Sequence, residues 1–430
     1  MKIIRIFCLL SLTIMLFNVS PISASAHSDT KPYPATNGKA VILMDAHSGR
    51  VLYEHNSHEQ LPPASLTKIM TGLLVVENGD LEQRVTASAH AAATPESTIY
   101  LEPGEILTRM ELLYAAMLPS ANDACTALAE NVAGDEAGFV AQMNKRAGEL
   151  GLKNTHFANP HGLEAEGHYS SAYDLALLTK QALSYPLFAK VTATERKVIP
   201  WAAKDEDRIL LNHNRLLYNY DGAIGVKTGY TRQAGNCVVG AAQRGDMVLI
   251  AVTMNSPTVY SDLQQMLDYG FEQYKMVTLG KVGEVSGTVN VLQGTAAKVK
   301  ATLARNLSIA AADEEIPYLA YSFALKPTAA APVEPGDILG TCRLYLKGEQ
   351  IGSINMVADE RIGIKHSWME ASALGKLATA VFTKWRLLLF GLILLLLLVI
   401  YLCRKRLEEA LKRLILFLLP ARIKEQHRRN

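Results

Sequence analysis

The feature that most restricts the fold of this chain is an unbroken apolar run near its C-terminal end, residues 387–403. Basic residues flank the run on both sides, and Trp385 and Tyr401 stand near its two ends. A helix of roughly 17–25 apolar residues can cross the hydrocarbon core of a bilayer. Aromatic and basic residues are typical of the two membrane interfaces. We therefore expect a transmembrane helix over residues 386–403, and not the alternative, a buried core helix.

The N-terminal end has the pattern of a secretory signal peptide. Lys2 and Arg5 precede a mostly apolar stretch, and Ala24-Ser25-Ala26 supplies the small residues of a cleavage site. We expect residues 1–26 to be removed on export. The alternative is an uncleaved N-terminal membrane anchor. Residues 27–38 then form a polar linker.

Charge is unevenly distributed along the chain. Residues 404–430 carry nine Lys or Arg against three Glu, although the formal net charge of the whole chain is only +2. The body that precedes the tail is therefore mildly acidic, which argues against a nucleic-acid partner. Because the more basic flank of a membrane helix faces the cytoplasm, we expect a single-pass protein of the cell membrane. Its body is extracytoplasmic, and residues 404–430 form a basic amphipathic cytoplasmic tail.

The body itself predicts an α+β domain over residues 39–275. Residues 40–44 and 51–54 have the pattern of a β-hairpin, and buried-type strands return at residues 223–252 before a closing helix at 260–274. Between them the spacing of apolar residues predicts a block of helices. Strands at both ends of one domain favour an antiparallel sheet that the two ends share. Short strands with Gly and Pro turns predict a small all-β domain at residues 276–370.

The five cysteines do not form a recognisable set. Cys8 lies in the signal sequence and Cys403 at the end of the membrane segment. The other three fit neither a metal site nor a disulfide scaffold by spacing, so we interpret them as small buried residues. A bridge between Cys125 and Cys237 is an alternative that the sequence leaves open.

Chemistry is first indicated by Ser65-Leu66-Thr67-Lys68, which follows a pair of prolines and opens an apolar stretch. A serine and a lysine three residues apart on a helix lie on the same face. A neighbouring amine without its proton can take the hydroxyl proton and make the serine a nucleophile. Alone, this short pattern is more typical of an ordinary solvent-exposed helix face.

Two further polar motifs follow along the chain. Ser120-Ala121-Asn122 interrupts two helical stretches, where its alternative role is a helix N-cap. Lys227-Thr228-Gly229 belongs to a buried strand, and a lysine there must find a partner unless it lies in a surface turn. The edge of such a strand can also bind a peptide backbone.

Together, Ser-x-x-Lys, Ser-x-Asn and Lys-Thr-Gly, in this order, are the motif set of the serine acyltransferases that recognise penicillin. The chain resembles the D-alanyl-D-alanine carboxypeptidases, which are low-molecular-mass penicillin-binding proteins. The stretches 63–70, 119–124, 154–163 and 225–231 carry this resemblance, which covers about residues 35–270. It implies a β-lactamase/penicillin-binding transpeptidase-like domain, followed by the all-β domain and the membrane helix.

The resemblance also implies the chemistry of the site. Ser65 is the nucleophile, and Lys68, kept neutral by a cationic neighbourhood that includes Lys227, is its base. Ser120 relays a proton, and Asn122 positions Lys68 and the substrate. The substrate-binding residues are Lys227, Thr228, Gly229 and Tyr230, of which Tyr230 shares an oxyanion hole with the backbone of Ser65. No cofactor and no metal are expected. The partners are a peptidoglycan stem peptide ending in D-Ala-D-Ala and β-lactam antibiotics, which acylate the enzyme. The loop that contains His161 is interpreted as structural.

The chain departs from the family pattern at two positions. Tyr230 stands where some members have histidine, but its expected contact is through the backbone. Many members have a cation soon after the last sheet strand, near the substrate carboxylate, whereas residues 255–260 contain none. Recognition of that carboxylate is therefore expected to depend on Lys227, Thr228 and Arg232.

Three other functions remain as alternatives. A β-lactamase of the same fold would need a deacylating glutamate between the second and third motifs and an acidic residue at Ala121. A D,D-endopeptidase would use the same machinery on crosslinks. A non-catalytic wall-binding scaffold would not need the intact set of motif residues.

Overall fold

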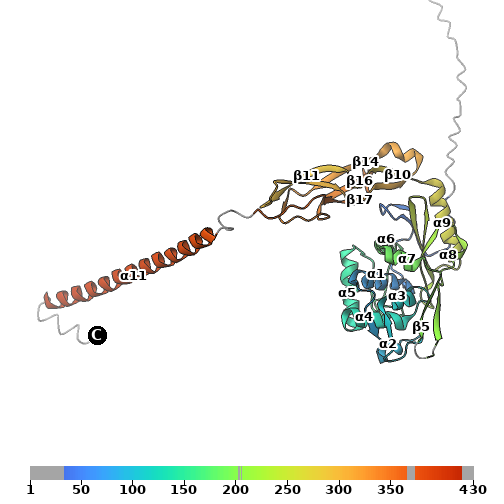
Figure 1. The fold of residues 1–430 in the computed structure, drawn as a ribbon, viewed down its shortest axis with the longest axis horizontal. Helices are drawn as coiled ribbons and strands as arrows, with labels where there is room; N and C mark the ends of the chain where they lie inside the picture. The colour runs from blue at the N-terminus through green and yellow to red at the C-terminus, as the bar shows by residue number, and fades with distance from the viewer. Residues whose placement is uncertain (1–32, 202–203, 205, 366–372, 419–430) are drawn as a thin grey trace, which may run out of the picture. The chain divides into compact units, whose positions relative to one another are not determined.

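The computed structural model of the chain describes residues 33–201, 204, 206–365 and 373–418 (Figure 1). The predicted signal peptide and residues 27–32 of the predicted linker lie outside the described residues. The chain packs as two units. Of the described residues, the first unit contains those up to Gly280 together with Leu307–Tyr321 and Arg343–Ser353. The second contains Lys281–Asn306, Ser322–Cys342 and the described residues from Ile354 onward. The domain limits expected from the sequence stay a prediction.

A five-stranded antiparallel sheet with the order β2-β1-β9-β8-β7 organises the first unit. Its strands are β1 Ala40–Asp45, β2 Val51–His55, β7 Ala223–Thr231, β8 Gly235–Arg244 and β9 Met247–Met254. Strand β1 pairs with β9, with Val41 opposite Thr253, so the two ends of the predicted domain do share one sheet. The α+β prediction is therefore confirmed. Strand β7 lies at the edge of the sheet.

Helices cover both faces of this sheet. A helical block covers one face, with α1, α3, α4 and α5 grouped together in Figure 1. The block contains α1 Lys68–Asn78, α3 Arg109–Met117, α4 Asn122–Ala133, α5 Glu136–Glu149, α6 Ala172–Leu183 and α7 Pro186–Thr192. Helix α9, Val259–Gln273, covers the other face. Because side chains alternate along a strand, Ile42 of β1 joins the core under the block and Val41 the core under α9.

Smaller elements connect the sheet and the helical block. They are β3 Arg84–Thr86, α2 Ala89–Ala92, β4 Ile106–Thr108, the β5–β6 hairpin of Arg196–Trp201 and Glu206–Leu211, and α8 Leu216–Asn219. The hairpin, α7 and α8, which all lie between residues 184 and 221, were not predicted from the sequence.

The chain beyond α9 is rich in strands, as the sequence predicts. Strand β10 pairs with β13, and six further strands form a sheet of order β14-β16-β17-β12-β11-β15. These strands are β10 Lys275–Gly280, β11 Val285–Leu292, β12 Lys298–Leu303, β13 Leu307–Ala311, β14 Leu319–Leu325, β15 Thr328–Ala330, β16 Ile338–Leu346 and β17 Glu349–Ala358. A 3₁₀ helix, η3, spans Asp313–Tyr318.

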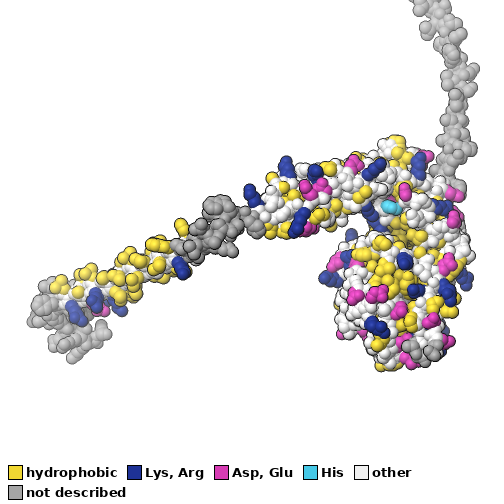
Figure 2. Space-filling view, viewed as in Figure 1, with side chains coloured by type: hydrophobic (Ala, Val, Ile, Leu, Met, Phe, Trp, Pro, Cys, Tyr) yellow, Lys and Arg dark blue, Asp and Glu magenta, His cyan; other side chains and the backbone are white. Residues whose placement is uncertain are grey.

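The chain ends in one long helix, α11, Ala373–Leu418. Within it, Phe382–Leu414 is long and apolar enough to cross a membrane, and none of this stretch is buried against protein. From Leu387 onward hydrophobic side chains follow one another along it until the basic residues that begin at Arg404 (Figure 2). These properties are consistent with a membrane anchor and do not match the alternative of a buried core helix.

Candidate active site

Ser65 lies on a tight turn that leads into a helix. Residues Ala64–Thr67 form a 3₁₀ turn, η1, which continues directly into α1 at Lys68. Thr67 Oγ1 donates a hydrogen bond of 2.8 Å to Ala64 O and stabilises the turn. Ser65 itself is only half-buried, so its hydroxyl remains accessible from the cleft. The predicted helix start is confirmed, with the serine one turn earlier than the α-helix proper.

Two glycines allow other segments to approach this turn closely. A Cβ atom on Gly162 would lie 1.9 Å from Ala64 O, and the residue has a φ of +93°. A Cβ atom on Gly229 would lie 3.0 Å from Ser65 N. Only glycine tolerates both the left-handed backbone and the contact at position 162. The 159–163 loop and strand β7 therefore pack directly against the nucleophile turn.

Lys68 lies beneath Ser65 and has three close oxygen neighbours. Its Nζ is 2.8 Å from Ser65 Oγ, 2.8 Å from Asn122 Oδ1 and 2.6 Å from His161 O. Burial lowers the pKa of Lys68 from 10.5 to about 8. A neutral amine has two N–H donors and one lone pair. Those donors match Asn122 Oδ1 and His161 O, which leaves the lone pair for the Ser65 hydroxyl.

The cause of this low pKa differs from the one expected. We expected the positive charge of Lys227 to keep Lys68 neutral. Burial is what lowers the pKa of Lys68, whereas nearby negative charges at Glu96 and Asp123 raise it. Desolvation disfavours the charged form of a buried amine even without a second cation.

Ser120 and Asn122 lie at the corner between α3 and α4. Asn122 Nδ2 donates to Pro95 O at 2.8 Å, which orients its Oδ1 toward Lys68. Ser120 has a φ of +68°, and its buried Oγ has no hydrogen-bond partner within the described chain. The N-cap residue of α4 is Ala121, without a side-chain cap bond. The N-cap alternative for this motif is therefore wrong.

Lys227 lies in the middle of strand β7 and is 1% exposed. Its Nζ donates to the backbone oxygen of Thr228 at 3.1 Å. Burial, and then the charge of Lys68, lowers the pKa of Lys227 well below its usual value. The alternative of a surface lysine in a turn is wrong, and the strand continues past the motif to Thr231.

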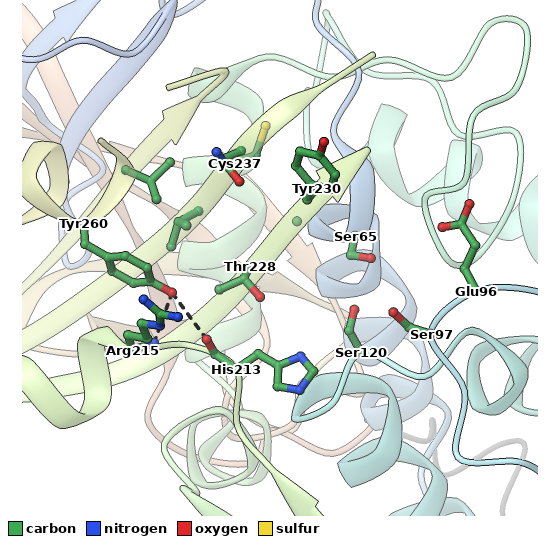
Figure 3. Close-up of a pocket in the computed structure, with 14 residues that line it drawn as sticks. Ser65, Glu96, Ser97, Ser120, His213, Arg215, Thr228, Tyr230, Cys237 and Tyr260 are labelled. Atoms are coloured by element: carbon green, nitrogen blue, oxygen red, sulfur yellow. Dashed lines mark hydrogen bonds between the residues drawn. The ribbon is translucent and has the colours of Figure 1, made fainter. Parts of the chain in front are cut away.

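A cavity of about 580 Å³ opens above these residues (Figure 3). Five of the predicted residues line it: Ser65, Ser120, Thr228, Gly229 and Tyr230. The other three, Lys68, Asn122 and Lys227, are buried and are not among the lining residues. The structure thus brings all three motifs together, with two buried amines behind a wall of hydroxyl and backbone groups.

The cavity also has lining residues that the sequence analysis did not single out for the site. They are Glu96, Ser97, His213, Arg215, Asn236, Cys237, Val238, Val259 and Tyr260. The loop that carries Glu96 is held by Asp123, whose carboxylate accepts from the backbone of Ile99 and Leu101. An aspartate directly after the Ser-x-Asn motif was the available signal. His213 and Arg215 had none, because the chain around them was not assigned to any element.

The 159–163 loop supports the site through its backbone. Pro160 O accepts from Thr71 Oγ1 at 2.5 Å, and His161 O accepts from Lys68. Burial, and then the Lys68 charge, lowers the pKa of His161 to about 3, so its ring is neutral at physiological pH. This agrees with the structural interpretation of the loop.

The cysteines of the described chain are free thiols. Cys125, Cys237 and Cys342 are buried, and Cys403 is exposed on α11. The alternative of a Cys125–Cys237 bridge is therefore wrong. Cys8 lies outside the described residues.

Comparison with known proteins decides the family. Residues 26–258 match the model of the D-alanyl-D-alanine carboxypeptidase family of serine peptidases. The chain belongs to the D-alanyl-D-alanine carboxypeptidase family. Residues 271–363 match a second model, the C-terminal domain of penicillin-binding protein 5. The enzyme is thus a serine peptidase and a penicillin-binding protein, as the three motifs predict.

Proteins named D-alanyl-D-alanine carboxypeptidases align with most of this chain. The D-alanyl-D-alanine carboxypeptidase DacF of Bacillus subtilis is 39% identical, over 83% of this chain and 94% of its own. DacC of Escherichia coli is 34% identical, over 81% of this chain and 89% of its own. The crystal structure of penicillin binding protein 5 from Haemophilus influenzae superposes with a TM-score of 0.61 at 28% identity, covering 77% of this chain and 99% of that one.

Proposed function

We propose that this carboxypeptidase removes the terminal D-alanine of peptidoglycan stem peptides through an acyl-enzyme on Ser65. The observation that carries the proposal is the placement of Lys68 Nζ, 2.8 Å from Ser65 Oγ, with two further oxygen neighbours that use both donors of a neutral amine. A base within hydrogen-bond reach of the nucleophile, held by a third group, is the requirement for an activated serine.

In the acylation step, Lys68 takes the proton of Ser65, and Oγ forms a bond with the carbonyl carbon between the two D-alanines. The resulting oxyanion accepts from the backbone N–H groups of Ser65 and Tyr230. The C–N bond then breaks, and the proton passes from Lys68 through Ser120 to the leaving amine. The unpartnered, buried hydroxyl of Ser120 at the cavity wall supports this relay.

Substrate binding uses the free edge of β7. An extended peptide that lies along this edge bonds to its backbone in the manner of an added strand. Gly229 keeps β7 close to the Ser65 turn, while Thr228 offers its hydroxyl from the cavity wall. Lys227 supports this edge from below, and Asn122 contacts both Lys68 and the substrate amide.

Deacylation needs water as its only further reactant. A water molecule attacks the ester carbonyl, its proton returns through Lys68 to Ser65 Oγ, and the shortened peptide leaves. A β-lactam forms the same ester when Ser65 opens its ring, and therefore acts as an acylating inhibitor.

A β-lactamase function is less well supported. It needs a glutamate base from the segment between the second and third motifs, and within the described chain the cavity residues from that segment are His213 and Arg215. Endopeptidase activity on crosslinks uses the same residues and is distinguished below by substrate. The chain of contacts around Ser65 argues against a non-catalytic scaffold.

For the whole chain, we propose a signal peptide at 1–26, a linker at 27–38, a catalytic domain at 39–275 and a β-rich domain at 276–370. The membrane helix at 386–403 anchors the protein once in the cell membrane. The run of basic residues from Arg404 supports a cytoplasmic tail at 404–430, with the catalytic domain on the outer side.

The test uses the full chain in detergent, with fluorescent penicillin and a pentapeptide ending in D-Ala-D-Ala. The wild type should be labelled and should release D-alanine, and Ser65→Ala should do neither. Ser184→Ala, an exposed serine at the end of α6, is the matched control and should behave as the wild type. Labelling or D-alanine release by Ser65→Ala contradicts the proposal. Rapid turnover of penicillin indicates a β-lactamase, and faster cleavage of a crosslinked dimer indicates an endopeptidase.

A further inference from the structure

A carboxypeptidase must distinguish a chain end from a mid-chain bond, and the free carboxylate of the last residue is the feature that differs. The segment that follows β9, residues 255–260, offers no cation for it. Arg232, the substitute suggested by the sequence, is exposed but is not among the residues that line the cavity. Arg215 is.

The other basic groups near the cavity are poor sources of positive charge. Lys227 is buried behind the wall, and its pKa is well below the usual value because of burial. The pKa of His213 is lowered by burial and then by the charge of Lys227, so its ring is neutral at physiological pH. A guanidinium stays charged at every physiological pH. Among the lining residues in the described part of the chain, Arg215 is therefore the one permanent cation.

The backbone at Arg215 is fixed, while its side chain is available. Arg215 N donates to the hydroxyl of Tyr260 at 3.1 Å, and that hydroxyl donates to His213 O at 3.3 Å. Asn214 Oδ1 accepts from Leu216 N at 3.1 Å and stabilises the same turn. The Arg215 side chain is exposed, and no hydrogen bond or ion pair occupies its guanidinium within the described chain.

Tyr260 lies in the segment that lacks the basic residue found in many family members, and it contacts the backbone of Arg215. This segment follows the last strand of the sheet. In place of a cation it supplies the phenol of Tyr260, whose two hydrogen bonds fix the backbone at Arg215. Figure 3 shows Arg215 and Tyr260 on the side of Thr228 away from Glu96. An anion at one end of the cavity and a cation at the other favour one orientation of a peptide that ends in a carboxylate.

We propose that Arg215 binds the terminal carboxylate of the departing D-alanine together with Thr228, and so determines the preference for a free chain end. The inference rests on the proposed function and deepens it. The guanidinium makes two parallel N–H···O bonds to the carboxylate, the geometry for which arginine is suited. Tyr260 acts through the backbone of Arg215 and is a positioning residue.

The test compares two thioester substrates that differ only in this carboxylate. One is an N-acyl-D-alanyl thioester of thioglycolate, and the other is its methyl ester. Both leaving groups are reactive, so that both rates are measurable in the full-length enzyme. In the wild type we expect kcat/KM to favour the free carboxylate. In Arg215→Gln the value for the free carboxylate should fall about 10- to 100-fold, the loss expected for a charge-assisted bond, and the methyl ester should be unaffected.

Three variants sharpen the result. Arg215→Lys should restore part of the preference, because it keeps the charge and loses the paired donors. Tyr260→Phe should reduce the preference by a smaller factor, because only the brace is lost. Arg232→Gln, the matched arginine outside the cavity, should leave both substrates unchanged. The methyl ester rate reports on folding and on the acylation machinery in every variant.

Equal losses for both substrates in Arg215→Gln would show a structural role and overturn the inference. Unchanged discrimination in that variant, or loss of discrimination in Arg232→Gln, would overturn it as well. The proposed function fails separately: in that case the wild type turns over neither thioester, or Ser65→Ala turns over both.

Discussion

Lys68 and Lys227 are buried to nearly the same extent, with 0% and 1% of their surfaces exposed, yet their surroundings differ. Lys68 has three oxygen neighbours within 2.8 Å, one of them the nucleophile. Lys227 has one, the backbone oxygen of Thr228, at 3.1 Å. Burial lowers the pKa of both amines, and the charge of Lys68 lowers the pKa of Lys227 further. The neighbours decide which amine can receive a proton from Ser65 and which one supports the substrate strand.

The largest expected effect follows from removing the amine of Lys68. In Lys68→Met the side chain keeps its length and loses its base, so β-lactam acylation should fall about 10³-fold, as for the loss of a general base. The acylation rate is measured by stopped-flow or mass spectrometry. Lys190→Met, an exposed lysine of α7, serves as the control. A loss below about tenfold would mean that another group takes the proton.

Lys227→Met should have a smaller effect on the same rate, about 10- to 100-fold, because this amine contacts the strand and not the nucleophile. Its melting temperature should hold or rise, since a buried amine with a single weak partner is replaced by an apolar side chain. Should this variant acylate more slowly than Lys68→Met, the assignment of the two lysines would have to be exchanged.

Gly162→Ala tests the loop that holds Lys68 without touching either lysine. The added methyl group meets Ala64 O in a left-handed backbone, so we expect a loss of about 2 kcal/mol in the free energy of unfolding and an acylation rate about tenfold lower. Gly148→Ala is the matched control, because a Cβ atom there meets nothing within 4 Å. That helical substitution should be neutral or stabilise by up to about 1 kcal/mol. Equal stability of the two variants would contradict the packing described here.

The sequence predicts more of the sheet and motifs than of their surroundings. The apolar strands at both ends of the domain are long and regular, so that a sheet shared by the two ends follows from their pattern. The motif residues are recognisable because three short patterns occur in one order. The pKa of Lys68 was attributed to the wrong cause, because desolvation depends on how many distant segments pack around the amine, and no local pattern records that.

Arg215 was missed for a related reason. Its segment is short and irregular, and the hydrogen bonds that fix it come from Tyr260, 45 residues further along the chain. The segments Leu307–Tyr321 and Arg343–Ser353 likewise join the first unit through contacts such as Arg50 Nη1 to Ala310 O at 2.7 Å. A charged side chain in a turn does not indicate from sequence which distant groups it will meet.

The pH dependence of β-lactam acylation tests the central claim most directly, namely that burial alone makes Lys68 a base at physiological pH. The neutral amine is the active form, so the wild-type rate should rise about tenfold per pH unit below a pKa of about 8 and level off above it. In Lys227→Met this midpoint should move by less than about 0.5 pH unit, the smallest effect predicted here. A midpoint that rises by about one unit or more in Lys227→Met would show that the second lysine's charge, and not burial, sets the pKa of Lys68.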